Sequence, residues 1–521
     1  PLHAVDLIAK FPFVSFVDQI SEPGKPEGDP ARHLHRSNML DSDFPTGRHY
    51  DGTGIRVMVR DDGAVGPHID FQGRLNQGTN YGGGHGDAVT GMVGAAGNLD
   101  PTQRGAARGA EIFVRNYQSD FLDGIIDLYQ NENVLLTNSS YSDGCNNGYN
   151  DNASTVDFQV FENPTLMHVF SAGNAGGSDC NYGAGANWGN ITGGHKIGKN
   201  VFTIGNVQPD GTLENNSSHG PATDGRIKPD LCANGVMTTT TANNQYTTTN
   251  GTSFAAPAVM GVMAQLYQAH QELEGDIPAS ALIKSILLNT ATDIENEGPD
   301  FRSGWGIVNA HRAVRCLEDQ RYLEDEIVQG ENNSHNMTLT NDVRQLKVML
   351  YWADAEGVPN VAKALVNDLD LNLTAPNGEV HLPWVLDESP DPIMLNLPAV
   401  QGVDHLNNME QVVINNPVAG VYSFNVDGFE LPFGSVKYYI SYELITDEIT
   451  LIYPNGGEGL VPNEMVKIHW EAFDQSNNYL LEYSSDEGNT WNNIAIVDGG
   501  VRSYDWGIPN LATGLVRVRI S

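Results

Sequence analysis

The sequence predicts an α/β unit followed by two all-β units. Apolar strands at residues 55–60 and 167–171 each end in a polar turn that contains glycine. Residues 252–266 are typical of a helix that is apolar on nearly every face, so we expect it to be buried. After about residue 320 the helical periodicity disappears. Short alternating strands with Gly, Pro and Asn turns replace it, and these favour β-sandwiches.

Length and charge limit the possible functions. The chain has 521 residues, which suggests two to four domains. Its 28 Lys and Arg against 65 Asp and Glu give a net charge of −37. This charge argues against a nucleic-acid partner, and it suits a very soluble, secreted protein that binds calcium. No apolar run reaches the roughly 18 residues of a membrane span, so we expect no membrane partner.

The most informative segment is the glycine turn that runs into the predicted buried helix. Gly251 and Thr252 precede Ser253 at the start of that helix. The Ser253 hydroxyl would lie in the positive field of the helix N-terminus, beside a backbone N–H that can point at an anion. That position suits a nucleophile whose product is an oxyanion. The alternative is a serine that only caps the helix.

Three upstream residues stand where strands end or a helix begins. Asp61 ends the strand at residues 55–60, and Asn174 follows the strand at residues 167–171. In doubly wound α/β folds the carboxyl ends of strands carry the chemistry. His85 follows three glycines and opens a helix of small residues. Serine needs a base with a pKa near 6.5 to take its proton, and histidine supplies one. Taken singly, Asp61 also fits a plain turn and His85 a structural role.

The order Asp, His, Asn, Ser resembles the subtilisin family of serine proteases. The resemblance covers about residues 50–315 in six blocks, which include 85–94, 172–174, 251–257 and 304–310. Asp62 and Asp87 depart from the Ser or Thr that many relatives carry.

The resemblance implies a subtilisin-like parallel-sheet catalytic domain. Asp61, His85 and Ser253 would form the catalytic triad. The Asn174 side chain would donate to the tetrahedral intermediate beside the Ser253 N–H. The substrate would pair as an added strand along a specificity pocket. The residues expected to line that pocket are Ser140, Tyr141, Ser142 and Gly173.

The resemblance also bears on the four cysteines. Cys145 and Cys180 follow loops that are neighbours in the family fold, so it implies a disulfide between them. Cys232 lies in a strand block and is expected to be a buried thiol. Cys316 is either a second buried thiol or the partner of Cys232.

The C-terminal segments resemble modules found on secreted enzymes. Residues 366–378 resemble the β jelly-roll domain of some alkaline subtilases. Calcium prefers carboxylate and carbonyl oxygens, and the candidate ligands for a structural calcium are Asp354, Asn367, Asp368 and Asp370. The alternative is a solvated acidic loop, and no catalytic cofactor is expected. Residues from about 448 resemble immunoglobulin- or fibronectin-like β-sandwiches.

We therefore expect three domains: a catalytic domain with an N-terminal extension at 1–318, a jelly roll at 319–447 and a small β-sandwich at 448–521. Residues 1–20 would be a propeptide remnant or an extra edge strand. The expected function is a secreted, monomeric serine endopeptidase that degrades proteins or peptides broadly. The alternatives are a selective processing protease and, more remotely, an inactive adhesion or binding protein.

Overall fold

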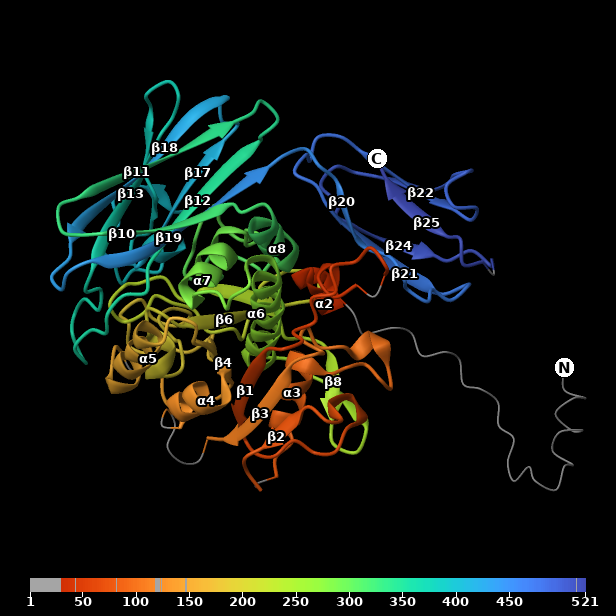
Figure 1. The fold of residues 1–521 in the computed structure, drawn as a ribbon, viewed down its shortest axis with the longest axis horizontal. Helices are drawn as coiled ribbons and strands as arrows, with labels where there is room; N and C mark the ends of the chain where they lie inside the picture. Colours follow the sequence, from red (N-terminus) through yellow and green to blue (C-terminus); the bar gives the residue numbers. More distant parts are fainter. Residues whose placement is uncertain are drawn as a thin grey trace, which may run out of the picture.

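A seven-stranded parallel sheet forms the centre of the N-terminal half of the chain (Figure 1). The computed structural model describes residues 30–42, 44–80, 82–117, 122, 124–145, 148–511 and 513–521. The expected strand or propeptide remnant at residues 1–20 lies outside them. The strand order is β2-β3-β1-β4-β5-β6-β7. The bounds are β1 Arg56–Asp61, β2 Leu75–Gln77, β3 Glu111–Asn116, β4 Val134–Ser139, β5 Met167–Ser171, β6 Phe202–Val207 and β7 Leu231–Asn234.

Helices cover both faces of this sheet, so its strands are buried on both sides. In β1, Val57 and Val59 face the core that contains α6, whereas Met58 faces a second core with α4 and α5. The helices are α3 His85–Gly94, α4 Ile125–Glu132, α5 Asp151–Glu162, α6 Thr252–Glu274, α7 Ser280–Asn289 and α8 Ala310–Glu318. This arrangement confirms the predicted α/β unit.

Helix α6 is the buried helix that the sequence predicts. It packs against β4 to β7, α3 and α8, and all of its residues from Ala255 to His270 are buried. Gly251 precedes it with a φ of 152°, a backbone conformation that residues other than glycine rarely adopt. Pro257 lies inside the helix, so its missing N–H leaves the Ser253 carbonyl without its usual partner four residues on.

Two four-stranded antiparallel sheets follow α8 and share one apolar core. Their orders are β10-β19-β12-β17 and β11-β18-β13-β14. The bounds are β10 Tyr322–Ile327, β11 Asn332–Leu339, β12 Gln345–Tyr351, β13 Asp368–Thr374, β14 Val380–His381, β17 Met409–Asn415, β18 Gly420–Glu430 and β19 Val436–Ile445. A short pair, β15 Trp384–Val385 and β16 Val400–Gln401, accompanies them, and another, β8 Thr238–Thr241 and β9 Gln245–Thr248, precedes α6.

The first of these sheets packs on the α/β unit through its outer face. In β12, Val348 and Leu350 face the core between the two sheets, while Met349 and Tyr351 join the core of the α/β unit. Helix α7 lies against β12 and β19 and is buried along its whole length. The two units therefore share a continuous apolar interface.

A third group of strands forms two three-stranded sheets, β20-β21-β24 and β23-β22-β25, around its own small core. The bounds are β20 Thr450–Tyr453, β21 Met465–Glu471, β22 Tyr479–Ser484, β23 Asn492–Val497, β24 Ser503–Gly507 and β25 Arg517–Ile520. The group packs on α2, Pro30–His35, where His33 stacks on Tyr453 of β20 with ring centroids 4.0 Å apart, and on the segment after α2. Asn38 donates to the Ile452 carbonyl at 2.8 Å, and Asn455 donates to the Asn38 carbonyl at 3.0 Å.

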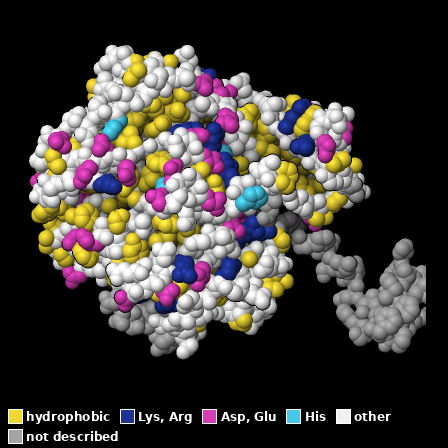
Figure 2. Space-filling view, viewed as in Figure 1, with side chains coloured by type: hydrophobic (Ala, Val, Ile, Leu, Met, Phe, Trp, Pro, Cys, Tyr) yellow, Lys and Arg dark blue, Asp and Glu magenta, His cyan; other side chains and the backbone are white. Residues whose placement is uncertain are grey.

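A groove separates the two β units, and basic side chains gather in it (Figure 2). Three of these arginines form ion pairs across the groove: Arg36 with Glu471, Arg312 with Glu443, and Arg315 with Glu448. Arg36, directly after α2, thus pairs with β21 of the last β unit, and the two arginines of α8 pair with β19 and with the segment that follows it. Among the residues described, none of the helices has the length and apolar composition to cross a membrane.

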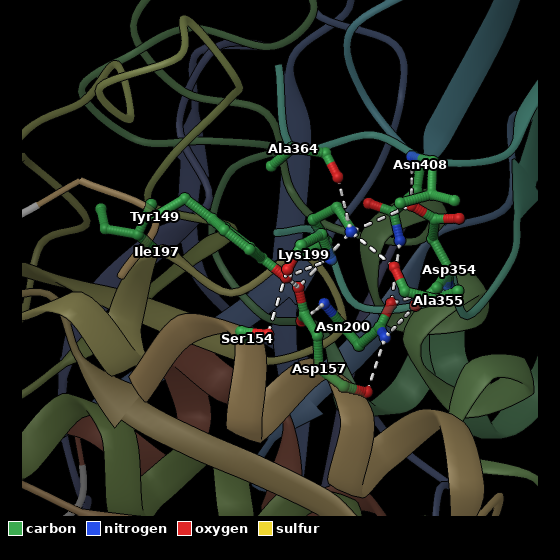
Figure 3. Close-up of polar contacts among 12 residues, drawn as sticks. Tyr149, Ser154, Asp157, Ile197, Lys199, Asn200, Asp354, Ala355, Ala364 and Asn408 are labelled. Atoms are coloured by element: carbon green, nitrogen blue, oxygen red, sulfur yellow. Dashed lines mark hydrogen bonds and ion pairs between the residues drawn. The ribbon is translucent and has the colours of Figure 1, made fainter. Parts of the chain in front are cut away.

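A buried lysine joins the α/β unit to the first β unit (Figure 3). The ammonium of Lys199 lies 3.1 Å from an Asp354 carboxylate oxygen and 3.7 Å from one of Asp157. It also donates to the carbonyls of Ala355 and Ala364 at 2.7 Å each. A buried charge is tolerated only when it is paired and hydrogen-bonded in this way.

Replacement of Lys199 by methionine should destabilise the chain strongly, because it leaves the Asp157 and Asp354 carboxylates buried without their cation. We expect a loss of about 3–5 kcal/mol in the free energy of unfolding, measured by urea denaturation. Lys437→Met is the matched control, because Lys437 forms an exposed pair with Glu324 that is worth about 1 kcal/mol or less. Equal losses in the two variants would contradict the role of Lys199.

Candidate active site

Strand β1 and helix α3 bring an aspartate and a histidine into contact. Asp61 is the last residue of β1 and is buried, and His85 is the first residue of α3. His85 Nδ1 lies 2.6 Å from Asp61 Oδ1. Burial lowers the pKa of the imidazole, but the hydrogen bond and charge of Asp61, with the charge of Asp62, outweigh it and raise the pKa above its ordinary value. The pair therefore favours a positive charge on His85.

Asp62 fixes the start of α3, a role that the sequence analysis missed. Its carboxylate accepts the backbone N–H of His85 at 3.0 Å and that of Gly86 at 2.7 Å. These N–H groups belong to the first helical turn and have no partner within the helix. Gly83 leaves room for this carboxylate, because a Cβ on Gly83 would lie 2.2 Å from Asp62 Cγ. Many relatives carry Ser or Thr at this position, so the sequence showed only that Asp62 differs from them. The structure shows that Asp62 caps the start of α3.

Ser253 lies in the first turn of α6. Its hydroxyl donates to the Ser140 carbonyl at 3.2 Å, so the structure places it against the end of β4. The neighbouring Phe254 packs on His85, with ring centroids 5.2 Å apart. This contact sets the His85 ring beside the start of α6.

The oxygen of the Asn174 side chain is fixed by the same turn. It accepts the backbone N–H of Thr252 at 3.0 Å and the Thr252 hydroxyl at 3.1 Å. Thr252 also accepts the Gly173 N–H at 3.1 Å. With the oxygen held in this way, the NH₂ group of Asn174 is left to donate elsewhere.

The four predicted pocket residues lie on two facing segments. Ser140 turns its side chain inward, where Asn138 donates to it at 2.9 Å, and Tyr141 packs on Tyr117. Ser142 is exposed, and its hydroxyl lies 2.7 Å from that of Thr192. A Cβ on Gly173 would lie 2.2 Å from the same Thr192 hydroxyl, so this position requires glycine. Thr192 therefore joins the two segments, and no sequence signal had singled it out.

The cysteines arrange as the family resemblance implies. Cys145 and Cys180 form a disulfide with their Cα atoms 5.6 Å apart. Cys232 and Cys316 are both buried free thiols, so Cys316 is not the partner of Cys232. Burial raises the pKa of both thiols, which keeps them protonated.

The four predicted calcium ligands do not lie together. The Asp354 carboxylate accepts two backbone N–H groups and the Asn367 side chain, and it pairs with Lys199. Asp368 and Asp370 form a separate group with His405, in which one ligand atom of each lies within 4.8 Å of the others. His405 was not predicted, because it lies far from the two aspartates in the sequence.

Residues 52–306 match the subtilase family. Among curated proteins, the chain is similar to the serine protease/ABC transporter B family protein tagA of Dictyostelium discoideum, with 26% identity over 43% of this chain and 15% of that protein. It is 36% identical to the C5a peptidase of Streptococcus pyogenes over 24% of this chain and 11% of that protein. The chain thus matches only a small part of these two relatives.

Two further similarities cover more of the related protein. The alkaline elastase YaB of a Bacillus species is 24% identical over 53% of this chain and 69% of that protein. The solved structure of the prenylagaramide maturation protease PagA is 21% identical, with a TM-score of 0.42, and covers 50% of this chain and 93% of that one. The α/β unit belongs to the subtilase family, the subtilisin-like serine peptidases.

Removal of the Asp62 carboxylate should weaken α3 where it carries His85. We expect Asp62→Ala to lower the free energy of unfolding by about 1–2 kcal/mol, the usual cost of a lost helix cap. Asp62→Asn is the matched control, because it keeps one acceptor oxygen and should recover most of the loss. The measurement is thermal unfolding of both variants, and an alanine variant as stable as the parent would refute the capping role.

Proposed function

We propose that the chain is a serine endopeptidase that forms an acyl-enzyme on Ser253. The observation that carries this proposal is the 2.6 Å contact between Asp61 and His85, next to Phe254 at the start of α6. The family of the α/β unit supports the same assignment.

In this mechanism His85 takes the Ser253 proton as the hydroxyl attacks the substrate carbonyl. The hydroxyl rotates from the Ser140 carbonyl toward His85 Nε2. Asp61 holds Nδ1 protonated and stabilises the imidazolium that forms. His85 then gives the proton to the leaving amine. In the second half it activates a water that releases the acid product and restores Ser253.

The developing oxyanion would be held by the NH₂ group of Asn174 and the backbone N–H of Ser253. Fixed donors of this kind lower the barrier because they need no reorganisation during the reaction. The extended substrate would pair with the backbone of residues 140–142 as an added strand. Its side chain at the scissile bond would enter between Ser142 and Gly173.

We infer a broad, degradative use outside the cell. The similarity to an alkaline elastase and the disulfide support this reading. The alternative, a selective processing protease, gains support from the similarity to a peptidase that is named for the single target C5a. The remote alternative is an inactive binding protein on a protease fold, which would not react with a serine-directed label.

We also infer a division of the chain into domains at 1–318, 319–447 and 448–521. The core between the two four-stranded sheets and the core of the last part are each distinct from the main core of the α/β unit, which supports these boundaries; Met349 and Tyr351 of β12 nevertheless join that main core. The two four-stranded antiparallel sheets are consistent with a jelly roll, and the two three-stranded sheets with an immunoglobulin- or fibronectin-like module.

A structural cation would bind at Asp368 and Asp370 rather than at Asp354. One oxygen of each of these two carboxylates is buried without a hydrogen-bond partner, which fits a bound cation, while the other Asp368 oxygen pairs with Lys363 at 3.2 Å. The carboxylates suit calcium, and the imidazole of His405 suits zinc. When bound, the ion would stabilise this β unit and take no part in the proteolytic steps.

The serine assignment is tested with a fluorophosphonate that labels activated serines. We expect the parent chain to be labelled on Ser253, and Ser253→Ala to lose both labelling and peptide hydrolysis while keeping its melting temperature. Loss of the triad serine costs about 10⁶ in kcat in subtilisin itself. Ser435→Ala, at an exposed serine, is the control and should remain active. A folded Ser253→Ala chain with more than about a thousandth of the parent kcat would refute the assignment.

The cation site is tested by removal of metal from the full chain. Chelation should lower the melting temperature, and added calcium or zinc should restore it, because a ligand that binds only the folded state stabilises it. Asp370→Asn should abolish this response, whereas Asp498→Asn, at an exposed aspartate, should retain it. If chelation and the addition of either ion leave the melting curve of the parent chain unchanged, the chain has no such site.

A further inference from the structure

Lys196 is a fully buried lysine directly behind the proposed substrate pocket. It lies in the short 3-10 helix η4, Gly194–Ile197. Its ammonium donates to the Thr192 hydroxyl at 3.0 Å and to the Ser142 hydroxyl at 3.5 Å. These are the two hydroxyls that join the segments on either side of the pocket. The positive charge therefore lies one layer of hydroxyl groups below the exposed Ser142.

The other lysines buried to this degree have carboxylate partners. Lys199 pairs with Asp354, and Lys228 and Lys284 both pair with Asp230 at 2.6 and 3.0 Å. Lys196 differs, because across the described part of the chain it forms no ion pair and its hydrogen bonds go to neutral hydroxyls. A buried ammonium without an anion is costly.

Two titratable groups lie close to Lys196. The Asp143 carboxylate, whose charge acts on Lys196, lies on the exposed loop after Ser142 and is 3.4 Å from the ring of His195. Burial lowers the pKa of the Lys196 ammonium to about 7, and the charge of Asp143 offsets this only in part. Burial also lowers the pKa of His195 to about 4, so this imidazole is neutral and adds no second positive charge. A carboxylate that approaches Lys196 would therefore be attracted by its charge.

We infer that Lys196 makes the enzyme select an aspartate or glutamate side chain at the residue whose carbonyl is attacked. The substrate carboxylate enters between Ser142 and Gly173 and accepts a hydrogen bond from the Ser142 hydroxyl. The two hydroxyl oxygens of Ser142 and Thr192 lie 2.7 Å apart, so one hydroxyl donates to the other. With Lys196 donating to both oxygens and Thr192 donating to Ser142, the Ser142 proton is left to point toward the carboxylate. The inference rests on the proposed function and specifies its substrate.

A charge-assisted hydrogen bond distinguishes a carboxylate from a neutral group of the same shape. Hydrogen bonds to charged groups contribute more than neutral ones, which corresponds to about 10–100-fold in kcat/KM. Glutamate and glutamine match in size, so their ratio isolates the charge. A lysine that merely fills the pocket would instead favour glycine or alanine over both.

The experiment compares fluorogenic peptides that differ only at the residue before the scissile bond: Glu, Gln, Asp, Asn and Ala. We expect the parent chain to cleave the Glu peptide about 10–100-fold better than the Gln peptide in kcat/KM. Lys196→Met should bring this ratio to about one. Ser142→Ala, an exposed change that should not disturb folding, should lower the ratio as well. Lys437→Met is the control and should keep the parent ratio.

The outcomes separate this inference from the proposed function. If the parent is labelled by the fluorophosphonate but cleaves the Glu and Gln peptides equally, or prefers Ala, the inference is wrong and the protease assignment remains. If the parent is neither labelled nor active, both are wrong. Should Lys196→Met fail to fold, the Glu to Gln ratio of the parent and of Ser142→Ala still decides the question.

Discussion

The enclosure of α6 is the constraint on which the rest of the α/β unit depends. A helix that is apolar on nearly every face is stable in water only when other elements surround it. Here the sheet, α3 and α8 do so, and their positions fix where α6 begins. Because the helix starts beside the end of β4, its first turn holds Ser253 against Ser140 and Thr252 against Asn174. The packing of the core thus sets the geometry of the site at its edge.

Buried lysines show how the interior of this acidic chain accommodates positive charge. Lys199 is satisfied only because the first β unit supplies Asp354 and two carbonyl groups. Its position between the units means that the α/β unit is incomplete without its neighbour. Lys228 and Lys284 share Asp230 within the α/β unit. Lys196 is the contrast, since its partners are the neutral hydroxyls of Ser142 and Thr192.

The two adjacent aspartates at the end of β1 make different contacts with α3. Asp61 contacts the His85 side chain, while Asp62 accepts backbone N–H groups of the same helix. One carboxylate therefore orients the imidazole, and the other holds the helix that carries it. Both charges also raise the pKa of His85, which links the position of the imidazole to its basicity.

Much of this protein could be predicted from the sequence because its signals are local. Periodicity gave the buried helix and the strands before Asp61 and Asn174, and the order of the motifs indicated the family. The boundary at which helices give way to short strands was also visible near residue 320. These features depend on residues within a few positions of one another, so a linear reading can recover them.

The tertiary structure alone decided which distant side chains meet. Asp354 pairs with Lys199 and not with the group of Asp368, and His405 lies near Asp370. Cys232 and Cys316 remain separate thiols. Lys196 lies behind Ser142. Such contacts join segments tens of residues or more apart, and their partners are chosen by how sheets and helices pack. No local sequence pattern indicates these partners, because a charged residue that pairs in the interior cannot be told from an exposed one by its neighbours in the sequence.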